Sequence, residues 1–157
     1  MQTAKVNCSK CEGHSVGKIL WCDKCNNRGY VTVKVDTSVY DADYFLRGKE
    51  TGKSLYTNYR WMPDLTIPMC EAIINHCGIV KGAEVLDFGC ARGYTVKAMR
   101  ALGYDCYGVD CSAWAVDNCD PDVKDYIERG MMVPGDSYEW IIAKDVLEHV
   151  PDVAFTV

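Results

Sequence analysis

A short apolar run, a turn bounded by two glycines and a helical segment follow one another from residue 84 to residue 102. Residues 84–88 read Glu-Val-Leu-Asp-Phe, an apolar run typical of a buried parallel strand. Residues 89–93 read Gly-Cys-Ala-Arg-Gly, and residues 94–102 predict a helix that ends at Gly103. Glycines in such a turn let the backbone approach a ligand closely, and the helix N-terminus offers unpaired N–H donors. The segment therefore predicts the first unit of an α/β fold with a ligand site at its turn.

A second strand is predicted at residues 105–109, and Asp110 follows it directly. Asp110 comes about 20 residues after Gly89, the spacing at which a carboxylate accepts hydrogen bonds from the ribose of an adenosine ligand. The alternative role for Asp110 is to cap a helix predicted at residues 112–118. The turn reads Asp-x-Gly-x-x-x-Gly, and a carboxylate ahead of the first glycine suits an ammonium group better than the pyrophosphate of a dinucleotide.

Together with a third segment at residues 139–152, these motifs resemble those of the class I S-adenosylmethionine-dependent methyltransferases. Asp87, Gly89 and Gly93 match the first motif of that family, and Asp110 matches the second. Residues 139–152 contain Asp-Val-Leu-Glu-His-Val-Pro-Asp, which is similar to the strand-four segment of the small-molecule branch. The resemblance implies a Rossmann-like parallel sheet that binds S-adenosyl-L-methionine across the carboxyl ends of its strands.

The resemblance also implies roles for individual residues. Asp87 would face the amino group of the cofactor, and Asp110 would hold the ribose. A third strand is expected at residues 123–127, which would bring Glu128 and Arg129 near the adenine. The implied cofactor-binding residues are Asp87, Gly89, Cys90, Ala91, Gly93, Asp110, Cys111 and Glu128.

Methyl transfer requires an acceptor placed in line behind the methyl group, so the protein supplies mainly positioning and at most one base. We expect Asp145 or His149, after the fourth strand, to be that base, with Lys144 and Glu148 as further residues to test. The other interpretation is that Glu148 and His149 begin a helix and hold the loop. The same segment is similar to the metal-binding phrase of small-RNA 2′-O-methyltransferases, which is a lesser alternative.

Four of the ten cysteines form two closely spaced pairs near the N-terminus, Cys8-x-x-Cys11 and Cys22-x-x-Cys25. A two-residue gap lets one turn direct both thiolates at one ion, and two such turns complete a tetrahedral Zn²⁺ site. Four protein ligands leave no open coordination position, so the predicted role is structural. The two halves resemble the CxxCxGxG repeats of DnaJ-type chaperones. The alternative is a reduced or disulfide-linked loop.

These patterns predict two parts of the chain. Residues 1–35 are expected to form a small zinc-ribbon or knuckle module that ends in a strand at residues 30–35. Residues 36–157 are expected to form a partial class I methyltransferase domain. It begins with an irregular or short-helical arm at residues 40–64, followed by a helix that has Pro68 in its first turn and ends at Gly78. The fold class is thus α/β, with a Rossmann-like sheet of about four strands.

The resemblance leaves strands five to seven of the family unmatched. We therefore expect either a fragment of a longer protein, or a partner or second copy that covers the exposed edge beside strand four. No stretch of the sequence reaches the roughly 20 apolar residues of a membrane helix, so no membrane partner and a cytoplasmic location are expected.

The expected function is transfer of a methyl group from S-adenosyl-L-methionine to a small molecule or sugar. The net charge of −5 argues against broad electrostatic binding of nucleic acid. Two alternatives are an RNA or protein acceptor and a non-catalytic zinc-containing scaffold built on a methyltransferase fragment. A nicotinamide-dependent oxidoreductase ranks below these.

Overall fold

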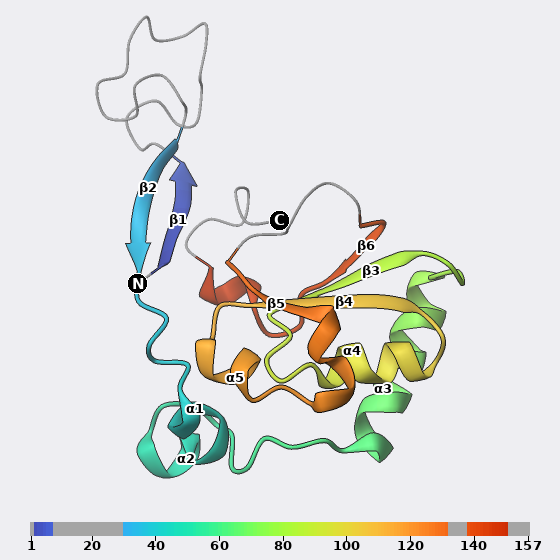
Figure 1. Ribbon diagram of the computed structural model, residues 1–157, viewed down its shortest axis with the longest axis horizontal. Coiled ribbons are helices and arrows are strands. Elements are labelled where there is room, and N and C mark those ends of the chain that lie inside the picture. The colour runs from blue at the N-terminus through green and yellow to red at the C-terminus, as the bar shows by residue number, and fades with distance from the viewer. Residues whose placement is uncertain (1, 8–29, 132–137, 151–157) are drawn as a thin grey trace, which may run out of the picture.

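The computed structural model describes residues 2–7, 30–131 and 138–150 (Figure 1). The four paired cysteines, Cys8, Cys11, Cys22 and Cys25, lie outside the described residues. Strands β1 (Gln2–Asn7) and β2 (Tyr30–Val35) flank that segment and pair antiparallel, with Asn7 opposite Tyr30. The sequence predicted β2 with these bounds but did not predict β1.

The second sheet is parallel throughout its described strands and has the order β5-β4-β3-β6. The first strand along the chain, β3, is central, and the chain then crosses to its other side to form β6. This reversal creates the switch point at which ligands bind in open α/β sheets. It confirms the predicted Rossmann-like sheet of four strands. The strands are β3 (Glu84–Phe88), β4 (Asp105–Asp110), β5 (Ile127–Arg129) and β6 (Trp140–Ile142).

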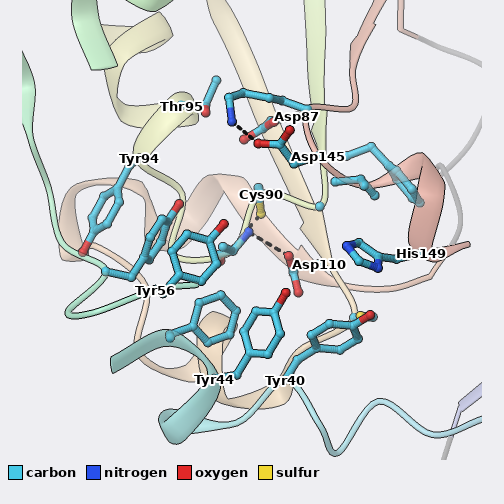
Figure 2. Close-up of a pocket in the computed structure, with 18 of the residues that line it drawn as sticks. Tyr40, Tyr44, Tyr56, Asp87, Cys90, Tyr94, Thr95, Asp110, Asp145 and His149 are labelled. Atoms are coloured by element: carbon cyan, nitrogen blue, oxygen red, sulfur yellow. Dashed lines mark hydrogen bonds and ion pairs between the residues drawn. The ribbon is translucent and has the colours of Figure 1, made fainter. Parts of the chain in front are cut away.

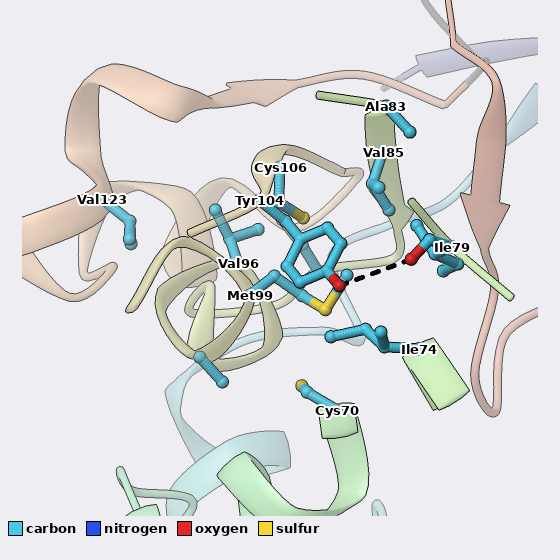
Figure 3. Packing of buried hydrophobic residues seen from close by; sticks show 12 residues of the cluster. Cys70, Ile74, Ile79, Ala83, Val85, Val96, Met99, Tyr104, Cys106 and Val123 are labelled. Carbon is cyan, nitrogen blue, oxygen red and sulfur yellow. Dashed lines mark hydrogen bonds between the residues drawn. The ribbon is translucent and has the colours of Figure 1, made fainter. Parts of the chain in front are cut away.

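Two helices cover one face of this sheet, α3 (Pro63–Cys77) and α4 (Tyr94–Ala101). Their apolar side chains pack against those of β3 and β4 in a continuous core (Figure 3). Val85, Val96 and Met99 are fully buried there. On the opposite face, Leu86 belongs to a second buried cluster. Both faces of β3 are therefore buried, as the apolar run at residues 84–88 predicted.

The segment before α3 is the predicted irregular arm, with two short helices, α1 (Ala42–Leu46) and α2 (Gly48–Thr51). Asp41 caps α1, since its carboxylate accepts the backbone N–H of Tyr44 at 3.0 Å. Helix α5 (Ala113–Asp117) follows β4, and Ser112 caps it. The loop after β6 ends in the 3₁₀ turn η2 (Leu147–His149).

Two sequence predictions about element boundaries were wrong. Helix α3 begins at Pro63 and not near Pro68, because both prolines suit a first helical turn and the earlier one occupies it. Residues 121–126 form a 3₁₀ helix, η1 (Pro121–Tyr126), and not a strand. The carboxylate of Asp120 accepts the N–H of Asp122 at 3.1 Å and so begins η1, with Pro121 in its first turn. Glu128 and Arg129 consequently lie within β5 and not after it.

No helix in the described ranges is long and apolar enough to cross a lipid bilayer.

The close packing of α4 and its turn onto β4 depends on Gly108 in the middle of that strand. A Cβ atom at this position would lie 2.7 Å from Cys90 Sγ and 3.0 Å from Val96 Cγ2. We predict that Gly108→Ala lowers the free energy of unfolding by about 1–3 kcal/mol, the usual cost of overpacking a core. Urea denaturation measures the change. Removal of the sulfur in the double variant Gly108→Ala, Cys90→Ala should restore part of the loss, and wild-type stability of the single variant would contradict the prediction.

Candidate functional site

A cavity of about 690 Å³ lies at the carboxyl ends of β3, β4 and β6. Its lining comes mainly from the ends of the strands with the turn after β3, the arm before α3 and the loop after β6, and residues near the starts of α3 and α4, such as Thr66 and Thr95, complete it. Figure 2 shows the side chains of Asp87, Asp110, Tyr44, Tyr56 and Asp145 around a common space. The cavity therefore lies at the turn after β3, where the sequence predicts a ligand site.

The glycine turn is held to the neighbouring strand by its own N–H groups. Gly89 and Cys90 both donate to the carbonyl of Val109, at 2.8 and 3.1 Å, and Ala91 donates to Asp110 Oδ2 at 2.7 Å. Gly89 and Ala91 have φ angles of 80° and 49°, in the left-handed region. Because these three donors are used within the protein, they are not available to cradle a phosphate. The turn therefore suits an adenosine ligand without a pyrophosphate better than a dinucleotide.

Asp110 is buried at the end of β4 and organises the surrounding backbone. Its Oδ2 accepts the N–H of Ala91, and its Oδ1 accepts the N–H of Ser112 at 2.7 Å. Burial raises its pKa, while these two hydrogen bonds lower it. Asp110 is not the cap of α5, because the hydroxyl of Ser112 accepts the N–H of Ala115 instead. Each carboxylate oxygen keeps lone-pair capacity for a ligand donor.

Asp87 is a buried carboxyl group at the end of β3. Burial, and then the charge of Asp110, raise the pKa of Asp87 to about 7, while a hydrogen bond with Thr95 and the charge of Lys144 oppose the shift. A carboxyl group with this pKa changes its charge near neutral pH. A cationic ligand group bound beside it would favour the charged form.

The two cysteines of the predicted set differ in exposure. Cys90 is buried against β4, and burial raises the pKa of its thiol well above the ordinary range. Cys111 is half-buried, and burial together with the Asp110 charge raises its pKa to about 12. Both thiols line the cavity in their neutral form and act as small apolar surfaces.

Most of the predicted cofactor-binding residues line this cavity, but Gly93 and Glu128 do not. Gly93 precedes α4 with a φ of 78°, and a Cβ there would lie 2.1 Å from Ile127 Cδ1. Its contribution is thus close packing of α4 against β5. Glu128 is exposed on β5, and Gly130 and Met131 line the cavity after that strand instead.

The loop after β6 contributes the predicted acceptor-side residues. Lys144, Asp145 and His149 line the cavity, whereas Glu148 does not. Asp145 has a φ of 57° and forms an ion pair with Lys144. His149 is half exposed, and its ring lies edge-on to Tyr40 with 6.5 Å between ring centroids. Within the described ranges, no group of three or more His, Cys, Asp or Glu side chains is placed to hold a metal ion.

Four tyrosines of the arm, for which no function was predicted, line the cavity: Tyr40, Tyr44, Tyr56 and Tyr59. Hydrogen bonds from the rest of the domain hold the arm near both of its ends. The hydroxyl of Ser112 donates to the carbonyl of Tyr40 at 2.6 Å, and Arg92 donates to that of Tyr59 at 3.3 Å. The only sequence signal was the density of aromatic residues in a segment without periodicity.

Comparison with protein families gives one match. Residues 66–157 match a family described as a methyltransferase domain, which is more than half of the chain. No match was found among the curated proteins.

Among solved structures, a Methanococcus maripaludis protein assigned to the S-adenosyl-L-methionine-dependent methyltransferases is similar, with 19% identity and a TM-score of 0.53 over 79% of this chain and 59% of that one. A protein of Anabaena variabilis, assigned as a methyltransferase from an antibiotic biosynthesis pathway, has 24% identity and a TM-score of 0.40 over 49% of this chain and 33% of that one.

A glycopeptide N-methyltransferase in complex with sinefungin has 13% identity and a TM-score of 0.40 over 50% of this chain and 36% of that one. The chain thus spans less than two thirds of the length of each of these three proteins. The likeness to the Methanococcus protein shows a shared fold. Because the family match extends over more than half of the sequence, this chain belongs to the methyltransferase domain family.

Proposed function

We propose that the protein is an S-adenosyl-L-methionine-dependent methyltransferase that acts on a small-molecule acceptor. The observation that carries this proposal is the placement of Asp87 and Asp110 on one cavity, on either side of a turn whose N–H donors are already used. Two carboxylates suit the ammonium group and the ribose hydroxyls of S-adenosylmethionine. A dinucleotide would instead require free N–H donors for its phosphates.

The described residues fit this cosubstrate. Asp87 would accept hydrogen bonds from the ammonium group. Asp110 would accept hydrogen bonds from the ribose hydroxyls, through the lone pairs that the N–H groups of Ala91 and Ser112 leave free. Cys111 and Met131 would flank the adenine, since they follow β4 and β5 at the cavity wall. When bound, S-adenosylmethionine supplies an electrophilic methyl group on a sulfonium cation.

His149 is our candidate for the base that takes a proton from the acceptor. Both predicted candidates line the cavity, but Asp145 is already paired with the ammonium group of Lys144. The imidazole of His149 is half exposed, and no cationic side chain in the described part of the chain is paired with it. Histidine is the side chain that most often acts as a general base in enzymes.

Three features favour a small molecule as the acceptor. The cavity volume lies within the range of small-molecule sites, about 300–1,000 Å³. The residues described in its lining include four aspartates but only two cationic side chains, Arg60 and Lys144, whereas binding to a nucleic-acid backbone requires a surplus of cations. The resemblance of residues 139–152 to the small-molecule branch points the same way.

We further propose that Cys8, Cys11, Cys22 and Cys25 bind one structural Zn²⁺ and that residues 1–35 form a module separate from residues 36–157. The support is the spacing of the four thiols together with the register of β1 and β2. Because Asn7 lies opposite Tyr30, the ribbon brings the two ends of the cysteine-bearing segment together. This is the arrangement that two zinc-binding turns require.

The proposed ribose contact predicts a loss of binding when Asp110 changes. Asp110→Asn should weaken the binding of S-adenosylmethionine by about 10- to 150-fold, the equivalent of the ~1.5–3 kcal/mol of a hydrogen bond to a charged group. Isothermal titration calorimetry measures the affinity, and urea denaturation without ligand reports any change in folding. Asp105→Asn, at the exposed opposite end of β4, is the matched control. Absence of saturable binding to well-folded wild-type protein would overturn the proposed function.

The raised pKa of Asp87 predicts opposite effects of pH on binding and on folding. Below about pH 7 Asp87 is protonated and cannot pair with an ammonium group, so affinity for S-adenosylmethionine should fall by up to about tenfold per pH unit.

In the unliganded protein the pKa lies above the ordinary value of about 4, so the folded state binds the extra proton. That contribution to stability is fully present below about pH 4 and is lost as the pH rises through about 7. Calorimetry and thermal unfolding between pH 5.5 and 8.5 measure both trends. Asp87→Asn should flatten each profile, and a pH dependence that persists in this variant would contradict the assignment.

The proposed metal site predicts one equivalent of zinc per chain, measured by mass spectrometry of the purified protein. Cys22→Ser should lower the zinc content substantially, because a three-thiolate site binds Zn²⁺ more weakly. Cys77→Ser, at an exposed cysteine of α3, should leave the zinc content unchanged. Equal zinc content in both variants, or a metal-free wild type that binds no added Zn²⁺, would show that the pairs do not bind the metal.

A further inference from the structure

The tyrosines of the arm face the carboxylates at the strand ends across the cavity. Burial is the main cause of a raised pKa in all four tyrosines. The negative charge of Asp87 raises the pKa of Tyr59 further, and that of Asp110 does the same for Tyr40, Tyr44 and Tyr56. All four hydroxyls therefore stay neutral at ordinary pH. The arm thus forms a second wall of neutral, electron-rich rings opposite the proposed cosubstrate contacts (Figure 2).

Tyr56 lies between two other rings of this wall, since it contacts both Tyr44 and Tyr59. Its pKa is raised mainly by burial, while Lys144 lowers it and both Asp145 and Asp110 raise it, so its hydroxyl lies within electrostatic reach of both sides of the cavity. In S-adenosylmethionine the sulfonium lies between the amino-acid end and the ribose. With those ends at Asp87 and Asp110, the sulfonium would lie in the region that Tyr56 faces.

The ring of Tyr56 is held in place before any ligand binds. Phe45 stacks on both Trp114 and Tyr56, with interplanar angles of 18° and 20°. The rings of Tyr44 and Tyr59 lie edge-on to Tyr56, with 5.8 and 5.0 Å between ring centroids. The backbone N–H of Tyr56 donates to the hydroxyl of Ser54 at 3.2 Å, and its carbonyl accepts the N–H of Lys49 at 3.0 Å. Tyr56 remains 38% exposed, and it lines the cavity.

The charges around this ring favour a cation. Asp145 neutralises Lys144 in an ion pair, and the carboxylates of Asp87 and Asp110 have no cationic partner in the described part of the chain. An aromatic face next to unpaired carboxylates is a recognised site for onium groups, because the ring quadrupole attracts positive charge.

We propose that Tyr56 contacts the sulfonium of S-adenosylmethionine, so that the site binds this cosubstrate more tightly than the product S-adenosylhomocysteine, whose sulfur carries no charge. The inference rests on the proposed function and deepens it. The two ligands differ by one methyl group and one positive charge, so the ratio of their affinities isolates the recognition of that charge. Product release would then follow from loss of the cation during transfer.

The test measures the dissociation constants of three ligands by calorimetry: S-adenosylmethionine, S-adenosylhomocysteine and sinefungin, an analogue with an amine in place of the sulfonium. We expect the wild type to bind the two cationic ligands about 2- to 30-fold more tightly than S-adenosylhomocysteine, the range of a cation–π contact. Tyr56→Phe should keep most of this preference, because the ring is retained. Tyr56→Leu should bring the ratio close to one.

Damage to the fold weakens all three ligands together and leaves the ratio unchanged, so the ratio separates charge recognition from a structural effect. Tyr126→Leu, which removes a ring that does not line the cavity, is the matched control and should keep the wild-type ratio. A wild-type ratio of one, or an unchanged ratio in Tyr56→Leu, would overturn the inference while the proposed function stands. Failure of the wild type to bind any of the three ligands would overturn both.

Discussion

The rest of the site depends on the two hydrogen bonds that the carboxylate of Asp110 accepts. One of its oxygens holds the glycine turn through Ala91, and the other holds the start of α5 through Ser112. Ser112 in turn fixes the arm, because its hydroxyl donates to the carbonyl of Tyr40. Asp110 and Ser112 together therefore join the glycine turn, the start of α5 and the arm. Because both of its oxygens already hold backbone N–H groups, the carboxylate is oriented before a ligand arrives.

The central part of this arrangement could be predicted from the sequence. The bounds of β3 agree with the predicted residues 84–88, and β4 extends the predicted strand by one residue to include Asp110. These strands are buried on both faces, so their residues form continuous apolar runs that need no distant partner to be recognised. Asp87, Gly89 and Asp110 could be placed on one cavity because parallel strands end at the same edge of the sheet.

The boundaries near prolines and the role of the arm could not be predicted in the same way. Pro63 and Pro68 satisfy the same local rule for a helix start, and only tertiary packing selects the first. The arm has no periodicity because its rings pack on one another and on Trp114 and do not form one face of a helix or strand. Its contribution to the cavity depends on contacts between residues far apart in the chain, such as Arg92 with Tyr59.

The contact between Gly89 and Val146 links the two halves of the cavity mechanically. A Cβ at position 89 would lie 2.3 Å from Val146 Cγ2, so the glycine turn and the loop after β6 touch without any intervening space. A side chain larger than hydrogen at position 89 would therefore collide with Val146, the residue next to Asp145. The missing side chain at position 89 thus sets how closely the loop that carries Asp145 and His149 can approach the turn.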